Sequence, residues 1–524
     1  MQYLPQLTVL LLFSLIACRI ESSNGAKILA IFPFTGRSQY ICGENYLKAL
    51  AARGHDVIVI SAYPQKKSIQ NFTDVSLIYE NDLFEEYIVD SEVLTLSKWE
   101  ELNFAIDYLT PSTRKVLEHP VLQKWLKNGV TFDLLIVEVL QQEALYALAY
   151  HFKALLIGVS SFGTDMRIDE LVGNTSPLSY IPSTTSHLTD QMNFRERLEN
   201  FYIHVLEWIH NRFVMLPAQY ELYKKYVPTP TAPFMEMRKN FSLVLLNQHF
   251  SMSLPRPYVP NAIEVGGWHI DHKPSKLPAD MERFINAAPK GVIYFSLGTN
   301  IRSRNLSAKR RAILMEVFAS LKQYNILWKF EDPKLPGKPT NVFISKWFPQ
   351  SDILAHPNVK LFITHGGLLS TIEAIHHAKP VVGMPVFYDQ HLNVARSQQK
   401  GFGVSVNFRS FTANQLKSAI VEVLENPKYA KRAKEISQLY HDQPETPVKK
   451  AIYWTEYVLR HKGAPHMRVA ARNLDFIEYH NLDVIAVLFG GPLLALLVVA
   501  WVSCKLLKAI AGRGNVQRKK EKRS

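Results

Sequence analysis

The first half of the chain alternates short apolar runs with segments of helical periodicity. Lys27–Phe32 is a continuous apolar run, residues 40–52 repeat apolar positions at helical spacing, and residues 56–60 form a second apolar run. The same order returns between residues 132 and 160, with a helical stretch over 143–151. Strand, helix, strand in this order predicts parallel strands in an α/β sheet.

The second half repeats the pattern after a break. Residues 255–290 are rich in Pro and Gly and indicate a linker, whereas residues 171–230 are irregular and then helical. That long insertion suits an acceptor-binding wall or a plain packing region. Apolar runs that predict further strands follow at 291–297, 326–330, 342–345, 361–364 and 381–384. We therefore predict two α/β domains, 25–254 and 291–440, and then helices over 441–482 that return across both.

Both ends of the chain carry apolar segments of a different kind. Residues 7–17 form an apolar run of signal-peptide length, so we predict a signal peptide over 1–24. Near the other end, residues 484–504 are 21 residues without a charge. At 1.5 Å per residue they span about 30 Å, the thickness of a bilayer core. We predict a transmembrane helix over 483–504.

The charge distribution sets the expected topology. Of the formal net charge of +14, eight Lys or Arg and one acid fall in residues 505–524, and no basic stretch with interleaved aromatics suggests nucleic-acid binding elsewhere. The positive-inside rule assigns this tail to the cytosol and the globular part to the lumen. Lys520 and Lys522 near the terminus resemble an endoplasmic-reticulum retrieval signal. A single-pass endoplasmic-reticulum membrane protein follows as the expectation.

Cysteine and asparagine usage fits that compartment. Only Cys42 remains in the predicted luminal part, so an internal disulfide is not expected there. Four glycosylation sequons start at Asn71, Asn174, Asn240 and Asn305. The predicted topology assigns all four to the glycosylated side of the membrane.

Residues 347–390 contain the most informative motif. Trp347 offers a flat face for a base, and the apolar run at 361–364 ends in His365-Gly366-Gly367, where a helix begins. Strand, Gly-Gly and helix direct free backbone N–H groups and the positive end of the helix dipole at one point, which suits a diphosphate. The glycines allow a close approach. Asp389 follows the next apolar run.

The ordered set of motifs resembles the UDP-glycosyltransferase family, specifically the membrane-bound UDP-glucuronosyltransferase type, with an insect-like N-terminal loop at 32–36. The resemblance runs from about Lys27 to the C-terminus and is most specific at 295–298, 347–390, 441–444 and 460–463. It implies two facing Rossmann-like domains of the GT-B type with the active site in the cleft. It also implies a hexosyl transfer, from UDP-glucose or UDP-glucuronate to small lipophilic acceptors, with inversion.

The resemblance assigns donor roles position by position. Trp347 would stack on the uracil, Gln350 would bond the nucleoside and Glu373 the ribose hydroxyls. The diphosphate would lie against Ser296 with the Gly298-Thr299 turn, and against His365 with the helix behind it. Asp389 and Gln390 would bind sugar hydroxyls. The full implied set is Arg256, near the linker and facing the diphosphate, with Ser296, Gly298, Thr299, Trp347, Gln350, His365, Gly366, Gly367, Glu373, Asp389 and Gln390.

The acceptor side departs from the family pattern. The family's general base is a His in the loop after the first strand, oriented by a carboxylate. The matching position here is Gln39, and an amide accepts no proton near neutral pH. The carboxylate falls at Glu143, with Glu138 as the alternative register.

Three functions remain open from the sequence. The first is an active hexosyltransferase that uses Glu143 or a relaxed mechanism. The second is a catalytically impaired paralogue that binds UDP-sugar or lipophilic ligand without efficient turnover and could act as a partner subunit in a homo- or hetero-oligomer. The third is a membrane receptor or carrier, against which Asp389-Gln390 and Trp347 speak. UDP-sugar is the expected co-substrate, and no permanent cofactor or metal is expected because the sequence lacks an Asp-x-Asp pair.

Overall fold

The computed structural model describes residues 25–79, 97–228, 233–271 and 273–521, with the side chains of 511–521 left aside. The predicted signal peptide over 1–24 lies outside the described residues. The chain divides into two compact units, one reaching Arg468 and the other covering Val469–Ser524. Each is described by itself.

The N-terminal half of the first unit contains a seven-stranded parallel sheet of order β3-β2-β1-β4-β5-β6-β7. The central strands β1, β4, β5 and β6 are short, mostly apolar and buried on both faces because helices cover both sides of such a sheet, whereas the edge strand β3 carries exposed polar residues. Ile28, Ala30, Leu134 and Ile136 are fully buried neighbours on β1 and β4. The strands are β1 Lys27–Phe32, β2 Asp56–Ser61, β3 Phe72–Ser76, β4 Leu134–Glu138, β5 Leu155–Ser160, β6 Leu243–Leu246 and β7 Ala262–Glu264.

The C-terminal half contains a six-stranded parallel sheet of order β10-β9-β8-β11-β12-β13. In both sheets the first strand in sequence lies centrally and the order reverses beside it, as in Rossmann-like folds, which bind ligands at this reversal. The strands are β8 Val292–Ser296, β9 Asn325–Lys329, β10 Val342–Ser345, β11 Val359–Thr364, β12 Val381–Gly383 and β13 Gly403–Ser405. The predicted α/β fold class with two Rossmann-like sheets is confirmed.

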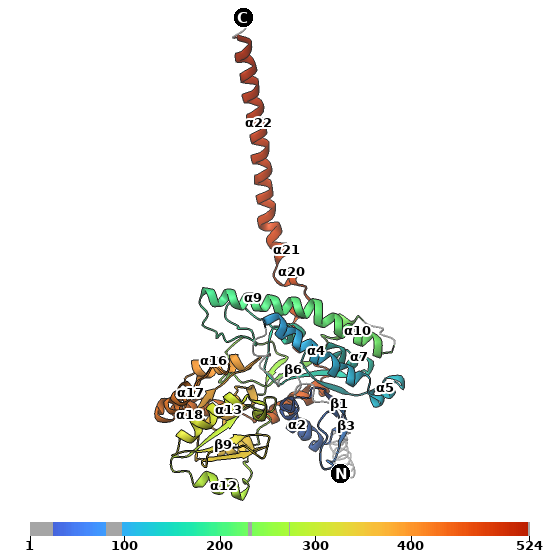
Figure 1. The fold of residues 1–524 in the computed structure, drawn as a ribbon. Helices are drawn as coiled ribbons and strands as arrows, with labels where there is room; N and C mark the ends of the chain where they lie inside the picture. The colour runs from blue at the N-terminus through green and yellow to red at the C-terminus, as the bar shows by residue number, and fades with distance from the viewer. Residues whose placement is uncertain (1–24, 80–96, 229–232, 272, 522–524) are drawn as a thin grey trace, which may run out of the picture. The chain divides into compact units, whose positions relative to one another are not determined.

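Helices cover the faces of the two sheets (Figure 1). The stretch predicted as one helix over 143–151 is two short helices that meet at Ala147. The helices of the N-terminal half are α2 Arg37–Ala52, α4 Lys98–Leu117, α5 Pro120–Lys127, α6 Glu143–Tyr146, α7 Leu148–His151, α8 Met166–Val172, α9 Phe194–His210, α10 Leu216–Tyr226 and α11 Phe234–Met237, with a π-helical turn, η1, at Asn211–Met215. Those of the C-terminal half are α12 Ala279–Asn286, α13 Ala308–Ser320, α14 Gln350–Ala355, α15 Leu368–His376, α16 Gln390–Gln399, α17 Ala413–Glu425 and α18 Pro427–His441.

Helix α19, Pro447–Arg460, returns the chain to the N-terminal half. Its Thr455 hydroxyl is 2.6 Å from the Tyr46 hydroxyl on α2, and Arg53 donates to Glu456. Tyr440 on α18 donates to the carbonyl of Gly266 in the segment between the sheets. The two halves are thereby joined by direct contacts as well as by the covalent linker.

The second unit consists mostly of helix. α20 Phe476–Tyr479 and α21 Leu482–Ile485 precede a π-helical turn, η5, at Ala486–Gly490, and α22 spans Gly491–Glu521. Leu482–Ile510 is a 29-residue helical stretch apolar enough to cross a membrane, and none of its most apolar window is buried. The predicted apolar C-terminal helix is therefore present, and it extends further than 483–504.

Candidate active site

A cavity of about 900 Å³ lies between the two halves of the first unit. Its C-terminal side is formed by the ends of β8 and β11 and the segment after β12, and its N-terminal side by the loop after β1 and by α4. A cavity at the carboxyl ends of parallel strands is where open α/β sheets bind ligands. The sequence-predicted residues that line it are Gln39, Ser296, Gly298, Thr299, Trp347, Gln350, His365, Gly367, Glu373, Asp389 and Gln390.

One corner of the cavity is built from two tight turns that follow strands. β11 ends at Thr364, and His365-Gly366-Gly367 leads directly into α15, whose first N–H groups have no partner within the helix. Gly298 after β8 has a φ of +80°, and a Cβ there would lie 2.5 Å from the His365 ring. A Cβ on Gly367 would lie 2.6 Å from the same ring. Glycine at both positions is therefore what lets the imidazole lie against the turn.

The His365 ring is neutral at physiological pH. Burial, together with the charge of the nearby Lys329 ammonium, lowers its pKa to about 4. The Nδ1 atom is buried and has no hydrogen-bond partner among the described residues. A neutral imidazole with an unpaired nitrogen offers one hydrogen bond beside the N-terminus of α15. This corner suits the oxygen atoms of a diphosphate.

A second corner is organised around Glu373 on α15. Gln350 Nε2 donates to Glu373 at 2.6 Å and to Ser370 at 3.0 Å, while Gln350 Oε1 accepts from the Tyr294 hydroxyl. The His269 Nε2 atom is 3.6 Å from the other Glu373 oxygen. Gln350, which the sequence assigned to the nucleoside, is occupied here in holding Glu373. Glu373 lines the cavity, where its carboxylate can accept hydrogen bonds from hydroxyl groups.

Trp347 is 45% exposed at the rim of the cavity. The guanidinium carbon of Arg37, from the start of α2, lies 4.4 Å from the centre of its ring, in cation–π contact. A base that stacks on Trp347 must use the opposite face or displace Arg37. Arg37 is a residue that the sequence analysis missed, although it lies two positions before Gln39.

Asp389 and Gln390 lie at the opposite end of the C-terminal wall. Burial raises the pKa of Asp389 to about 6, although a hydrogen bond donated by Asn393 at 2.8 Å acts in the opposite direction. Gln390 Oε1 accepts from the backbone N–H groups of Val386 and Phe387, so this side chain shapes the loop after β12. Asp389 remains the acceptor that faces the cavity.

The N-terminal wall contains an apolar patch among polar side chains such as Lys98 and Glu101. Phe34 follows β1, and Phe104, Ala105 and Leu109 come from α4. Gln39 lines this part of the cavity near the start of α2, where its Oε1 accepts from the Ser38 hydroxyl at 2.8 Å. The wall offers surface for an apolar molecule and an amide at the position of the expected base.

Neither candidate carboxylate is in the cavity lining. Glu143 is buried on α6. Burial raises its pKa, although the charge of Arg238 acts to lower it. Glu138, the alternative register, ends β4 and accepts from Ser161, which does line the cavity. Burial raises the pKa of Glu138 to about 8. The structure therefore brings the alternative register, and not Glu143, closer to the acceptor wall.

Arg256 and Gly366 are the donor-side residues that the structure does not bring to the cavity surface. Arg256 is buried and donates to Asp169 at 2.6 Å and to the carbonyl of Thr175. It therefore joins the linker to the segment after α8. Gly366 is buried behind His365, with a φ of +83°.

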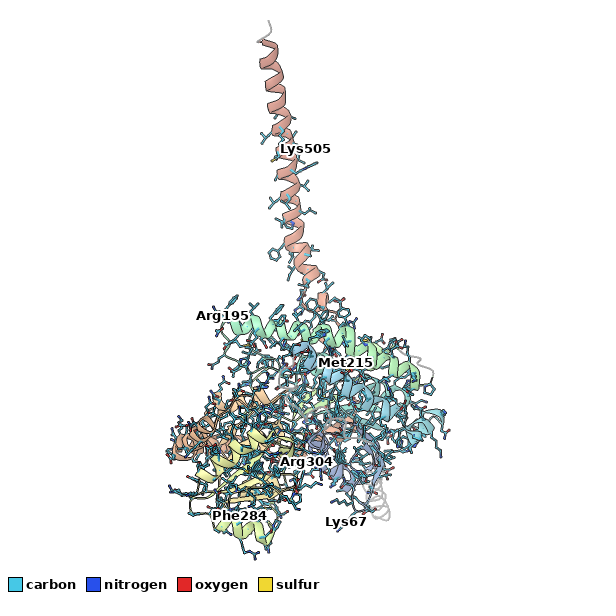
Figure 2. All side chains as sticks on the ribbon, viewed as in Figure 1. Lys67, Arg195, Met215, Phe284, Arg304 and Lys505 are labelled. Carbon is cyan, nitrogen blue, oxygen red and sulfur yellow. The ribbon has the colours of Figure 1, made fainter. Side chains whose placement is uncertain are left out.

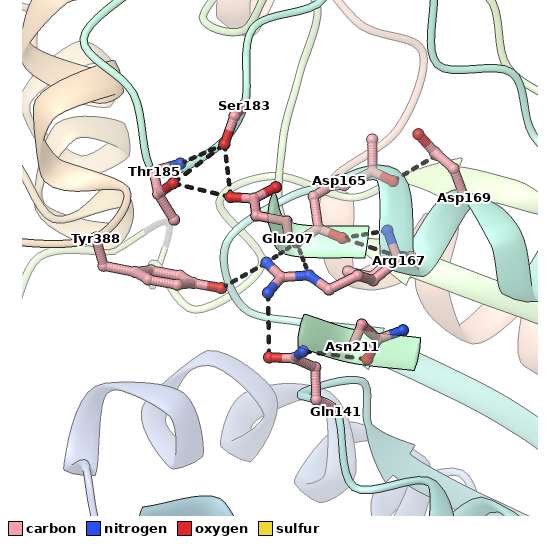
Figure 3. A network of polar contacts seen from close by, with 11 residues as sticks. Gln141, Asp165, Arg167, Asp169, Ser183, Thr185, Glu207, Asn211 and Tyr388 are labelled. Carbon is pink, nitrogen blue, oxygen red and sulfur yellow. Dashed lines mark hydrogen bonds and ion pairs between the residues drawn. The ribbon is translucent and has the colours of Figure 1, made fainter. Parts of the chain in front are cut away.

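A buried polar network joins the N-terminal half to the loop that carries Asp389 (Figure 3). Arg167 on α8 donates to Asp165, to Gln141 at 3.1 Å and to the Tyr388 hydroxyl at 3.1 Å. Gln141 and Tyr388 also line the cavity. Sequence reasoning missed this network because its members are distant in the chain, and no local motif signals it.

Comparisons with known proteins agree with this architecture. The chain matches the family model described as UDP-glucoronosyl and UDP-glucosyl transferase over residues 27–522. It is 34% identical to UDP-glucosyltransferase 2 of Dactylopius coccus, covering 95% of this chain and 96% of that protein. It is 33% identical to human UDP-glucuronosyltransferase 2B15, with 98% and 99% covered.

Two solved structures share the fold. The glycotransferase of kitacinnamycin superposes with a TM-score of 0.54 at 15% identity, covering 82% of this chain and 99% of that one. Spinosyn forosaminyltransferase SpnP gives 0.54 at 16% identity, with 83% and 100% covered.

The paired Rossmann-like sheets and the cavity between them place the chain in the GT-B fold class, which both solved structures share. Within that class, the chain belongs to the UDP-glucuronosyl and UDP-glucosyl transferase family. A UDP-sugar is accordingly the kind of co-substrate that the family uses.

Proposed function

We propose that this protein transfers a hexosyl group from UDP-glucose or UDP-glucuronate to small lipophilic acceptors, with inversion at the anomeric carbon. The observation that carries the proposal is the composition of the cavity walls. The C-terminal wall contains Trp347, His365, Glu373 and Asp389, while the N-terminal wall combines an apolar patch from Phe34 and α4 with polar side chains. A donor with a base, a diphosphate and a hydroxylated sugar fits the first wall, and an acceptor with an apolar body and a hydroxyl group fits the second.

The proposed donor roles follow from the local chemistry. The uracil stacks on Trp347, a contact worth about 1–3 kcal/mol in nucleic-acid systems. The ribose hydroxyls donate to Glu373, which Gln350 holds in place. The diphosphate lies against His365 and the N-terminus of α15, with Ser296, Gly298 and Thr299 beside it. The sugar hydroxyls donate to Asp389.

The proposed reaction is a direct displacement. The acceptor oxygen bonds to the anomeric carbon on one face while the bond from that carbon to the UDP oxygen breaks on the other. UDP leaves with the electron pair, and the acceptor's proton passes to a base. Gln39 cannot take this proton, so an acceptor that ionises easily, such as an acidic phenol or a thiol, reacts faster than an alcohol.

The protonation of Glu138 supports a second candidate, a paralogue that binds UDP-sugar without efficient turnover. A carboxyl whose pKa is raised to about 8 is mostly neutral at pH 7 and supplies little charge to orient a base. General-base help is typically worth about 10²–10⁴-fold in rate. Without it, donor binding persists while transfer to alcohols becomes slow.

Binding and turnover measured on the same purified full-length chain distinguish the two candidates. Thermal shift and calorimetry with UDP, UDP-glucose and UDP-glucuronate should show binding that Trp347→Ala weakens about 5- to 150-fold, the factor equivalent to about 1–3 kcal/mol. Trp99→Ala is the matched control, because Trp99 is exposed and outside the cavity lining. Transfer to 4-nitrophenol and 4-nitrothiophenol supports the enzyme, whereas binding without turnover supports the second candidate. Absence of any uridine diphosphate binding overturns both.

We also propose that residues 483–504 anchor the protein in the endoplasmic-reticulum membrane with the globular part in the lumen. The support is the uncharged segment between Asp483 and Lys505 and the basic residues that follow it. Alkaline extraction of membranes tests the anchor: the chain should stay in the pellet. Recovery in the supernatant contradicts the proposal.

A further inference from the structure

Helix α9 and the turn η1 bury several polar side chains, beside Ile203 and Met215, and expose a row of large apolar side chains. The buried side chains along this run include Asn200, His204, Glu207, His210 and Asn211. Arg195 and Met215, labelled in Figure 2, mark its two ends. A helix that faces water normally shows the reverse arrangement. The large apolar side chains that this run exposes are Phe194, Leu198, Phe201, Tyr202, Val205, Trp208 and Phe213.

The inward polar face is fixed by hydrogen bonds. Asn200 donates to the carbonyls of Leu178 and Ile181 at 2.8 Å each and accepts from the Ser183 N–H. Glu207 accepts from the hydroxyls of Ser183 and Thr185 (Figure 3). A rotation of the helix that hid its apolar face would leave these buried groups without partners, at a cost of about 1–3 kcal/mol each. The outward orientation of the apolar side chains is therefore a fixed feature of the fold.

The exposed apolar residues form a continuous stripe. Phe194, Leu198, Phe201, Val205 and Trp208 follow one another at intervals of four and three residues, which keeps them on one side of an α-helix. Phe194 is 72% exposed and Leu198 is 60% exposed. The stripe is about 20 Å long at 1.5 Å per residue. Single exposed apolar residues are ordinary, but a contiguous stripe marks a surface that is covered in use.

We propose that the outward face of α9 and η1, residues 194–213, lies on the surface of a lipid bilayer. The same chain carries a 29-residue helix apolar enough to cross a membrane. Such a helix would tether the whole chain, including α9, to a bilayer. Tyr202 and Trp208 are residues that favour the interface between lipid and water. This composition, an apolar stripe with aromatic side chains, is typical of helices that lie in the plane of a membrane surface.

Cations at the edge of the stripe fit the headgroups of such a surface. Arg195, Arg197 and Arg212 are exposed. Two acids lie nearby: Glu196 closes a capping box with Asn193, and Glu199 lies 4.0 Å from His187 Nδ1. Arg197 donates to the carbonyl of Met192 at 3.0 Å, whereas Arg195 and Arg212 can donate hydrogen bonds to the phosphate groups of lipid headgroups.

Contact with a bilayer would also define how acceptors arrive. Met215 at the end of η1 is fully buried against a cluster that includes Phe34, Tyr108 and Leu109, and these three line the cavity. The inward side of η1 therefore borders the apolar patch of the cavity's N-terminal wall. An acceptor dissolved in lipid would reach the cavity from beside α9, an extension that rests on the proposed transferase function.

The bilayer contact itself is tested without catalysis. In the full-length chain with Cys18→Ser and Cys504→Ser, a nitroxide is attached to single cysteines introduced as Leu198→Cys or Val205→Cys, leaving the buried Cys42. Leu439→Cys on α18 is the matched control, a leucine 55% exposed in the other half. In vesicles of phosphatidylcholine with about a quarter phosphatidylserine, collision with oxygen should exceed collision with a water-soluble nickel chelate at 198 and 205, and the reverse should hold at 439.

Each outcome decides the proposal. Equal nickel accessibility at 198, 205 and 439 overturns it. Shielding of 198 and 205 from both reagents, with dipolar broadening that vanishes on dilution with unlabelled chain, overturns it in favour of contact with a second copy. UDP binding by each labelled chain shows that the fold is intact, so misfolding is recognised separately.

The extension to acceptor delivery has its own test. Leu198→Glu with Val205→Glu should raise the KM for a long-chain alkylphenol held in vesicles about tenfold while leaving the KM for 4-nitrophenol within about twofold. Equal effects on both acceptors contradict delivery through the bilayer. Absence of turnover with both acceptors in the unaltered chain refutes the transferase proposal and leaves the nitroxide result intact.

Discussion

Gln39 is the residue on which turnover depends most directly. It lines the acceptor side of the cavity, and its amide offers no site for the acceptor's proton. Gln39→His should raise kcat for a phenol by about tenfold, below the 10²–10⁴-fold that is typical of general bases, because the neutral Glu138 carboxyl orients the new imidazole only weakly. Steady-state kinetics of the purified variant measure this. Gln39→Asn, which keeps an amide, is the control and should show no gain; an unchanged rate for the histidine variant contradicts the assignment of this position.

Asp389 predicts a pH dependence of donor binding. Its pKa is raised to about 6, so the carboxylate that accepts hydrogen bonds from sugar hydroxyls is present above pH 6 and is lost as the pH falls. Affinity for the UDP-sugar should weaken about tenfold between pH 7 and pH 5 if only the ionised form binds. Calorimetry across this range measures the change. The diphosphate of a UDP-sugar is esterified at both ends and does not titrate in this range, so Asp389→Asn should remove the dependence; an equal loss of affinity in that variant would falsify the role of Asp389.

Among the expected site residues, those that line the cavity have positions determined by local geometry. Those that do not line it are buried or held by residues distant in the chain. His365 and Gly367 lie where the motif predicts because a strand, a glycine turn and a helix determine one another's geometry locally. Glu138 ends β4, whereas Glu143 follows later in the chain, at the buried start of α6. The carboxylate nearest the strand end is therefore Glu138, and Glu143 does not line the cavity. Arg256 pairs with Asp169, 87 residues away, a partner that no local pattern predicts.

At the scale of elements, the loop after β12 is held by helix α8. Tyr388→Phe removes the hydroxyl that accepts from Arg167 at 3.1 Å, while Arg167 keeps Asp165 and Gln141. One buried hydrogen bond to a charged donor contributes about 1.5 kcal/mol. Because Asp389 follows Tyr388, the variant should bind UDP-sugar about tenfold more weakly and UDP alone almost unchanged, as calorimetry with both ligands would show. Tyr453→Phe, at a half-exposed site on α19, is the control; equal losses for both ligands indicate general loosening instead.

The strands were predictable from the sequence. For helix α9 the sequence predicted a helical segment but not which of its side chains are buried. Both sheets are buried on two faces, and continuous apolar runs such as 27–32 and 361–364 therefore predict their strands. In α9 the pattern predicts a helix, but it does not show that Asn200 and Glu207 are buried while Phe201 and Trp208 are exposed. Asn200 and Glu207 turn inward because Ser183 and the carbonyls of 178–181 need partners there. That requirement arises only once the irregular segment before α9 has folded.

At the scale of the whole molecule, the four sequons distinguish a luminal from a cytosolic globular part. Asn71 and Asn240 are exposed and Asn305 is partly exposed, whereas the Asn174 side chain is buried, donating to Asp169 at 2.8 Å and accepting from Val259. A glycan on Asn174 would break both contacts and has no space in the folded protein. The location of the globular part therefore predicts a particular pattern of modification.

Expression in cells that N-glycosylate should give a chain with glycans on Asn71 and Asn240 and none on Asn174, if the globular part is luminal. Asn71→Gln and Asn240→Gln should each increase mobility in gel electrophoresis by one step, and glycosidase treatment of the unaltered chain should remove both steps. Asn174→Gln is the control: it should leave the mobility unchanged and lower the thermal midpoint, because an Asn that accepts a backbone N–H and donates to a buried carboxylate is lost. A chain insensitive to glycosidase would indicate a cytosolic globular part and would reverse the topology inferred from the basic tail.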